Sequence, residues 1–317
     1  MGFIVKRLII SLPTLFLVSI LTFGAFRLIP GDAALLSLGT EASTEQIEAM
    51  RVEMGLDKSL PAQYLSWLKG FFTGTLGNSS RFRGISISEM ILERLPVTFA
   101  LAGFSFFLII IIAVPLSLLS VKKKNSLLDR TVTAITALNI SIPGFFLGVL
   151  FVWIFGVLLK FFVPGGYVSY SDSLSAFFGY LFFPALAIAM PNAALVAKFL
   201  RSSIFTEFQS SYARTAGSKG GSRSHILRRH VLKNAFLPVI TLLGMIAGEI
   251  FSGSIIIEQI FGIPGIGRLL IASIGSRDYL MIETIIVYIA FIVILANTLA
   301  DIVLQIVDPR IRLGEKV

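Results

Sequence analysis

The sequence predicts an all-α integral membrane protein with six transmembrane helices and with both termini in the cytoplasm. Apolar residues make up 55% of the 317 residues, charged residues only 14%, and the mean hydropathy is +0.87, all outside the usual range of soluble domains. A bilayer core about 30 Å thick requires roughly 20 apolar residues of helix, and six long stretches qualify. They carry no charge, apart from Glu249 in the fifth, and comprise residues 8–26, 95–121, 131–159, 173–197, 234–257 and 284–300, the last with an apolar continuation to 307.

The basic residues predict the orientation, because Lys and Arg accumulate in short loops on the cytoplasmic side of a membrane. The connection 122–130 carries four basic residues against one acidic residue. The loop 198–233 carries eight basic residues against the single Glu207, and this loop alone accounts for +7 of the net charge of +9. By contrast, residues 30–95 hold six basic and eight acidic residues. With its basic tail 308–317, the chain is therefore expected to have both ends in the cytoplasm.

Three regions follow from these stretches. Residues 1–94 comprise the first transmembrane helix and an external amphipathic helical segment, residues 95–307 form a five-span core that contains the loop 198–233, and residues 308–317 form a cytoplasmic tail. A cleaved secretory signal is the alternative for the first stretch, but no small-residue cleavage site follows it. We therefore retain it as a span.

The external segment contains two helix patterns with their own start and stop signals. Ser43 and Gln46 form a possible capping box, and Gly55 ends the first pattern. Pro61 suits the first turn of a second helix, which Gly74 ends. We expect a folded cap, which serves either as packing on the adjacent spans or as a gate or docking surface.

The loop 198–233 predicts a helical hairpin. Residues 205–220 are compatible with a short helix, Gly220 and Gly221 permit a left-handed turn, and Ser222 can cap a second helix through Leu232. A solvated basic loop attracted to anionic lipid head groups is the alternative. Nucleic acid is not an expected partner, because the flanking spans would hold any recognition helix against the bilayer.

Composition also limits the chemistry of the chain. With no cysteine and only His225 and His230, it offers no disulfide or thiolate and little material for a metal site. It has no Gly-Lys dipeptide, and hence no phosphate-binding loop of the G-x-x-x-x-G-K type. Catalytic serine and zinc-peptidase motifs are absent as well. We expect no catalytic residue, cofactor or metal on this chain.

The middle of the loop 198–233 carries a specific motif. It reads Tyr212-Ala213-Arg214-Thr215-Ala216-Gly217-Ser218-Lys219-Gly220, then Arg228-Arg229-His230 and Asn234-Ala235-Phe236-Leu237-Pro238. This pattern resembles the cytoplasmic signature of binding-protein-dependent ABC importer permeases, a coupling helix that docks on a separate ATPase subunit. Many members begin the signature with Glu-Ala-Ala, whereas Arg214-Thr215-Ala216 is similar to the dipeptide, oligopeptide and nickel branch, and Arg214 is a poor substitute for that glutamate. The resemblance implies a set of coupling residues comprising Arg214, Thr215, Ala216, Lys219, Gly220, Leu237 and Pro238.

Further motifs, in register along nearly the whole chain, resemble the first of the two permease subunits of that branch. They lie at residues 27–32, 54–57, 63–64, 75–79, 260–268, 277–279 and 308–312. The resemblance implies a homologous second permease, two cytoplasmic ATPase subunits that bind ATP and Mg, and an external solute-binding protein. It also implies a bacterial or archaeal inner membrane and a substrate class of dipeptides or oligopeptides, with nickel or a nickel chelate as the alternative.

Four polar or helix-breaking residues in the predicted spans are candidates for the translocation pathway. Glu249 is the one ionisable residue well within a span, where it is expected to face a cavity or a partner. Asn139, Ser141 and Pro143 in the third stretch can line a cavity. Packing explains all four nearly as well, and it is the expected use of the glycines at 244, 248 and 253. A secondary transporter that uses Glu249 as a proton or sodium site is the more distant alternative.

Overall fold

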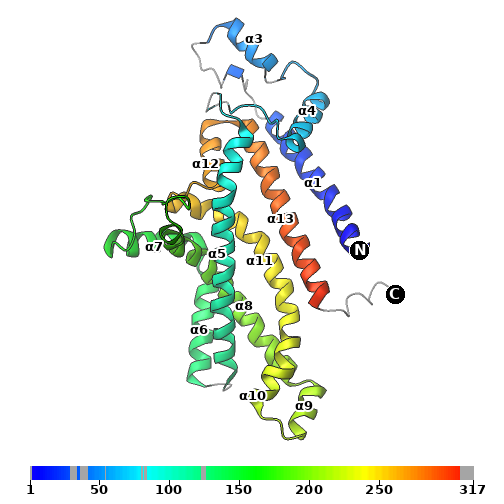
Figure 1. The fold of residues 1–317 in the computed structure, drawn as a ribbon, viewed down its shortest axis with the longest axis vertical. Helices are drawn as coiled ribbons and strands as arrows, with labels where there is room; N and C mark the ends of the chain where they lie inside the picture. The colour runs from blue at the N-terminus through cyan, green and yellow to red at the C-terminus, as the bar shows by residue number, and fades with distance from the viewer. Residues whose placement is uncertain are drawn as a thin grey trace. The chain divides into compact units, whose positions relative to one another are not determined.

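The computed structural model describes residues 2–28, 34–35, 42–53, 55–79, 81, 84–122 and 126–307 (Figure 1). Within these residues the chain is helical, apart from loops and a single isolated bridge between Asn78 and Ser86, so the predicted all-α class is confirmed. The predicted tail 308–317 lies outside them. The chain forms two compact units, which comprise Met1–Phe99 with Ile263–Ile294, and Ala100–Gly262 with Leu295–Val317.

The first unit holds the N-terminal span and the segment that follows it. Its helices are α1 (Gly2–Leu28), α3 (Thr44–Glu53), α4 (Leu60–Thr73), the beginning of α5 (Ile87–Lys122), α12 (Ile266–Ser276) and the beginning of α13 (Tyr279–Val307).

The two short helices α3 and α4 begin and end where the sequence predicts. The backbone N–H of Ser43 donates to Gln46 Oε1 at 3.0 Å, and the N–H of Gln46 donates to Ser43 Oγ at 3.3 Å, which together form the capping box. Gly55 follows α3 with a φ of +66°. Pro61 lies in the first turn of α4, and Gly74 ends that helix with a φ of +74°.

Helix α4 packs its apolar stripe against α1 and α13. Trp67 forms a buried cluster with Phe23 of α1 and Val287 of α13. At the edge of this cluster the Tyr64 hydroxyl lies 2.7 Å from Ser19 Oγ, so the polar end of an otherwise apolar ring has a partner. The segment that the sequence predicts to be external is therefore folded onto its own unit rather than forming a linker.

One buried ion pair joins the end of α1 to the beginning of α13. Glu283 is 0% exposed, and Arg27 Nη1 donates to its Oε1 at 2.7 Å. Arg27 Nε also donates to Gln63 Oε1 of α4 at 3.1 Å, and the guanidinium lies 4.3 Å from the centre of the Phe23 ring. Arg27 thus connects three helices of the first unit, α1, α4 and α13.

The second unit is built around the long helix α8, which packs against α6, α7 and α11. Besides the rest of α5 and the end of α13, the elements of this unit are α6 (Leu127–Ser141), α7 (Gly144–Phe151), the π-helix η1 (Val152–Leu158), α8 (Leu174–Phe208), α9 (Ser211–Ser218), α10 (Arg223–Ile226), the π-helix η2 (Leu227–Val231) and α11 (Leu232–Phe261).

Five helices in the described part of the chain are long and apolar enough to cross a membrane. They comprise Ile9–Leu28, Ile87–Lys122, Leu174–Phe208, Arg223–Phe261 and Tyr279–Ile306. The number of candidate spans rises to six if a bent pair of helices, Leu127–Ser141 with Gly144–Leu158, is counted as one span. Each of the six predicted stretches thus falls on a helix or on this pair.

The third predicted span, residues 131–159, is not one continuous helix. The chain bends by 96° between Ser141 and Gly144. Pro143 disfavours helical backbone at the residue before it, and Ile142 is accordingly extended, with φ −97° and ψ 120°. Because proline also has no N–H to donate, the helix ends here and a new one begins.

Two of the three glycines on α11 are buried, and one makes a close helix contact. A Cβ added at Gly244 would lie 2.2 Å from the Cβ of Ala300 on α13, so only glycine fits there. Gly248 is buried as well, whereas a Cβ at Gly253 would meet no atom within 4 Å. Close approach is therefore confirmed at Gly244, and within this chain it does not apply to Gly253.

We expect Arg27→Met to destabilise the first unit by about 3 kcal/mol, because it leaves the buried Glu283 carboxylate without its counter-charge. The double variant Arg27→Met/Glu283→Met should recover most of that loss, since it removes both charges together. Thermal unfolding in detergent measures both. A double variant no more stable than Arg27→Met would show that the arginine does not act through this pair.

Candidate coupling site

The chain between α8 and α11 forms a hairpin of short helices, here called the basic hairpin (residues 209–231). Its first helix, α9, begins at Ser211 rather than near residue 205, because α8 continues to Phe208. Ser210 separates the two helices: its Oγ donates to the Glu207 carbonyl at 2.6 Å and accepts from the N–H of Ala213 at 3.4 Å. One serine therefore ends α8 and caps α9.

The turn of the basic hairpin has the predicted left-handed residue. Gly220 adopts a φ of +80°, and the N–H of Gly221 donates to the Ala216 carbonyl at 3.1 Å. A Cβ at Gly221 would lie 2.9 Å from that carbonyl oxygen, so the second glycine permits a close backbone contact. Ser222 then caps the next helix by accepting from the N–H of His225 at 3.4 Å.

The sequence predicted that the second helix of the hairpin ends at Leu232, but in the structure the helix continues past this residue. α10 passes into η2 and then directly into α11, so the hairpin joins the following span without a loop. The π-helical turns at 227–231 widen the helix locally, a feature often found at functional sites.

Arg214 is held within the hairpin, although it is exposed. Its Nε and Nη2 donate to the carbonyl of Gln209 at 3.2 and 2.9 Å, which satisfies a carbonyl just beyond the end of α8. Thr215 likewise donates to the Ser211 carbonyl at 2.9 Å. Ala216 is half-buried and Lys219 is exposed at the end of α9, so the structure brings the predicted residues 214–220 together on one short element.

The other two predicted coupling residues lie apart from this element. Leu237 is half-buried and Pro238 is exposed, and both belong to α11 beyond η2. Neither lines the groove of the basic hairpin, whose walls comprise Ser211, Tyr212, Thr215, Ala216, Lys219, Gly221, His225 and His230.

Tyr212 and the two histidines are groove residues that the sequence reasoning did not select. The Tyr212 hydroxyl donates to the Glu207 carboxylate, and burial together with this bond raises the pKa of Tyr212 above its usual value, so it stays a donor at neutral pH. The His225 and His230 rings lie 6.2 Å apart, centre to centre. Their spacing of five residues on one helical run was the available signal. Across the described residues, no group of three or more His, Cys, Asp or Glu is arranged to hold a metal ion.

The pathway candidates lie on α11 and at the break between α6 and α7. Glu249 is exposed on α11, and its carboxylate makes no hydrogen bond or ion pair with any residue that the structure describes. Asn139 and Ser141 donate to carbonyls one turn earlier, those of Ile135 at 2.9 Å and Ala137 at 3.0 Å. The side chains of Asn139 and Ser141 are therefore hydrogen-bonded within α6. Of the polar pathway candidates, Glu249 is the one whose side chain has no partner among the described residues.

A helical chain with five, or up to six, helices long and apolar enough to cross a membrane is a multi-pass membrane protein. The chain belongs to the family of binding-protein-dependent transport system inner membrane components, whose model matches residues 113–313. The model of that family's N-terminal part matches residues 1–102.

Individual relatives match over almost their full length. A putative peptide transport system permease protein of Brucella abortus (strain 2308) is 37% identical, with 98% of each chain covered. The oligopeptide transport system permease protein AppB of Bacillus subtilis (strain 168) is 34% identical, covering 98% of this chain and 99% of the relative.

Two solved structures share the fold at low sequence identity. A chain of an amino acid ABC transporter with histidines matches at a TM-score of 0.53 and 16% identity, covering 70% of this chain and 94% of the other. A chain of the inward-facing MetNI methionine ABC transporter matches at a TM-score of 0.53 and 17% identity, covering 69% of this chain and 96% of the other.

We expect Gly220→Ala to loosen the basic hairpin, because a left-handed φ costs an L-residue about 1–2 kcal/mol. Gly217→Ala is the matched control: it lies within α9, where alanine is the better helix former and an added Cβ meets only Ile226 Cδ1, at 3.8 Å. Amide hydrogen exchange over residues 211–226 should become faster in the first variant and no faster in the second. Equal exchange in both would contradict the role assigned to Gly220.

Proposed function

We propose that this chain is the transmembrane permease subunit of an ATP-driven importer that takes up peptides delivered by a solute-binding protein. The observation that carries the proposal is similarity over 98% of the chain to proteins named as peptide permeases. The exposed element 214–220 supports it, because this element carries the motif expected of a surface that docks on an ATPase.

The proposed topology has six spans, in which α6 and α7 with η1 form one broken span. Both termini and the basic hairpin then lie in the cytoplasm, as the distribution of basic residues requires. A backbone break within the bilayer is tolerated where protein or water covers it, so the bend at Pro143 fits a position beside the pathway. The chain accordingly divides into regions 1–94, 95–307 and 308–317 in an inner cell membrane.

The proposed complex supplies the parts that this chain lacks. ATP and Mg bind to two cytoplasmic ATPase subunits, because this sequence has no phosphate-binding loop. A homologous second permease completes the pathway, and the solute-binding protein delivers substrate from outside. Closure of the ATPase subunits moves the basic hairpin and favours one arrangement of the spans over another. This chain needs no catalytic residue or cofactor for that role.

Peptides are the proposed substrate class, and nickel or a nickel chelate is the alternative. Glu249 exposes a carboxylate on an apolar span, which suits either a peptide amine or a cation. The names of the relatives favour peptides. An ion-coupled secondary transporter is the more distant alternative, with Glu249 as its ion site.

Reconstituted uptake tests the proposal. The chain is co-expressed with its neighbouring permease, ATPase and binding-protein genes and is placed in proteoliposomes with labelled dipeptides, longer peptides or nickel. We expect peptide uptake that requires ATP and the binding protein and is blocked by vanadate. Vanadate-insensitive, gradient-driven uptake by the chain alone would favour the secondary transporter, and uptake of nickel without peptides would favour the metal importer.

For Glu249→Gln we expect peptide uptake to fall about tenfold or more, because a charge-assisted hydrogen bond contributes about 1.5–3 kcal/mol. The matched control is Met245→Leu, which changes an exposed apolar residue one turn earlier on the same face of α11. Unchanged uptake and substrate preference in the Glu249 variant would assign this residue to packing against a partner subunit instead.

A further inference from the structure

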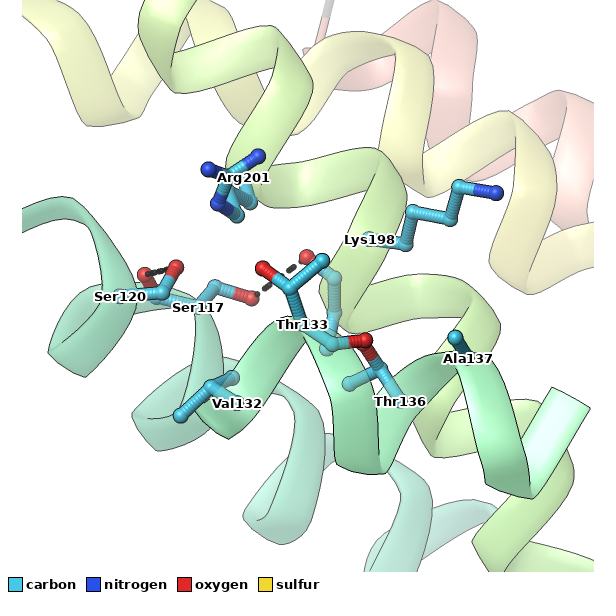
Figure 2. Close-up of a pocket in the computed structure, with 9 residues that line it drawn as sticks. Ser117, Ser120, Val132, Thr133, Thr136, Ala137, Lys198 and Arg201 are labelled. Carbon is cyan, nitrogen blue, oxygen red and sulfur yellow. Dashed lines mark hydrogen bonds between the residues drawn. The ribbon is translucent and has the colours of Figure 1, made fainter. Parts of the chain in front are cut away.

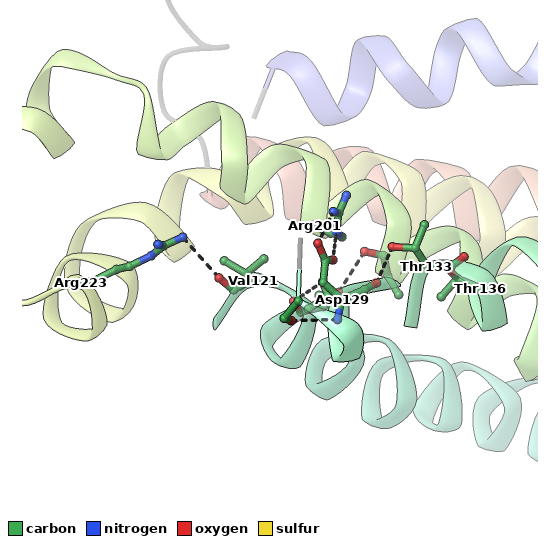
Figure 3. Close-up of polar contacts among 10 residues, drawn as sticks. Val121, Asp129, Thr133, Thr136, Arg201 and Arg223 are labelled. Carbon is green, nitrogen blue, oxygen red and sulfur yellow. Dashed lines mark hydrogen bonds and ion pairs between the residues drawn. The ribbon is translucent and has the colours of Figure 1, made fainter. Parts of the chain in front are cut away.

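A partly buried ion pair links the helix that leads into the basic hairpin to the first half of the broken span. Asp129, at the beginning of α6, is 3% exposed. Arg201 of α8 donates from Nε to Asp129 Oδ1 at 2.9 Å and from Nη2 to Oδ2 at 3.1 Å (Figure 3). Two parallel bonds to one carboxylate fix the orientation of both side chains, not only their distance.

Arg201 lies on the same continuous helix that leads into the basic hairpin, and the hairpin makes a second contact with α5. Arg201 lies seven residues before the end of α8, and its guanidinium sits 4.8 Å from the centre of the Phe205 ring. Across the hairpin, Arg223 of α10 donates to the Val121 carbonyl of α5 at 3.4 Å, which Figure 3 also shows. The basic hairpin is thereby tied to α5 and, through α8, to α6.

Next to the ion pair the helices do not close completely. A cavity of about 160 Å³ lies between α5, α6 and α8, with Thr133, Thr136, Lys198 and Arg201 among its lining residues (Figure 2). The hydroxyls of Thr133 and Thr136 donate to carbonyls of their own helix, at 2.8 and 3.0 Å, and so do not bridge α6 to α8. Beside this cavity the bidentate pair therefore joins the two helices, in addition to the side-chain packing between them.

The helix held in this way leads directly to the break in the span. α6 has 15 residues, so it is about 22 Å long at 1.5 Å per residue. Asp129 lies in its first turn, and its last residue, Ser141, comes two positions before Pro143. A displacement applied at Asp129 therefore reaches the 96° bend through one unbroken helix.

We propose that the Asp129–Arg201 pair is the positioning link that carries movement of the basic hairpin to α6 and hence to the break at Pro143. The inference rests on the proposed function, because it takes an ATPase as the source of that movement. Arg201 thus acts inside the bundle, as a mechanical connection, rather than as one more cytoplasmic charge.

The test compares transport with ATP hydrolysis in the assembled complex. In Asp129→Asn and Arg201→Gln we expect the ATPase subunits still to co-purify and to hydrolyse ATP, while peptide uptake per ATP falls about fivefold or more, the lower end of usual coupling between sites. The swapped variant Asp129→Arg/Arg201→Asp should recover more uptake per ATP than either single variant. A purely architectural pair would lower assembly and hydrolysis along with uptake.

Arg130→Gln is the matched control, because it removes a charge from the adjacent residue, which is exposed and makes no side-chain hydrogen bond or ion pair within the described residues. Peptide uptake per ATP hydrolysed in this variant should equal that of the unmodified chain. Wild-type uptake per ATP in the two single variants, or a swapped variant that assembles but couples no better than they do, would overturn the link. Failure of the unmodified chain to bind any ATPase would instead overturn the proposed function.

A distance measurement on otherwise unmodified protein keeps the link testable if the variants misfold. Since the chain has no cysteine, spin labels can be placed at the exposed residues Leu138, Val149 and Phe199 of α6, α7 and α8. On trapping with ATP and vanadate, the distance between Leu138 and Phe199 should stay constant while the distance between Leu138 and Val149, across the break at Pro143, changes. Separation of α6 from α8 would contradict the proposal.

Discussion

The structure depends on one property of its surroundings: the hydrocarbon core of a bilayer offers no hydrogen bonds. Helices meet this constraint for the backbone, and the polar side chains within or beside the spans meet it by pairing. Arg27 with Glu283 and Arg201 with Asp129 each join helices that are far apart in sequence. Where the backbone is interrupted, at Ile142 and Pro143, the side chains just before the break donate back into their own helix. The exposed carboxylate of Glu249 has no such partner among the described residues, and for that reason it is the strongest candidate for contact with cargo or with a partner.

Several basic side chains of the loop 198–233 are bonded within the protein rather than free to bind lipid head groups. Of the basic residues in the loop 198–233, Arg201 is committed to Asp129, Arg214 caps the end of α8, and Arg223 contacts the end of α5. A loop that served only to attract anionic lipid would leave these side chains solvated. Their internal bonds instead give the basic hairpin a defined shape and a contact with α5, as the lever that we propose between an ATPase and the spans would require.

Local signals in the sequence were sufficient for local structure. The capping box at Ser43, the left-handed Gly220 and the cap at Ser222 each involve residues within a few positions of one another, so their chemistry can be read directly. Hydropathy located each helix that is long and apolar enough to cross a membrane, but it could not show the bend at Pro143, because an apolar run has the same composition whether it is straight or bent. The Asp129–Arg201 pair joins residues 72 positions apart, and no periodicity encodes such a contact. The continuation of α8 to Phe208 was missed because polar residues beyond a span suggest a loop, although they are also compatible with a solvated helix.

We propose that α9 docks on a cytoplasmic ATPase subunit, and site-directed cross-linking is the sharpest test of this contact. A single cysteine introduced at the exposed Lys219 of the Cys-free chain carries a short photoactivated cross-linker in the assembled complex. The account predicts a covalent product with an ATPase subunit, in a yield that changes when ATP is bound. A product formed only with the external binding protein or with lipid, and none with an ATPase, would contradict it.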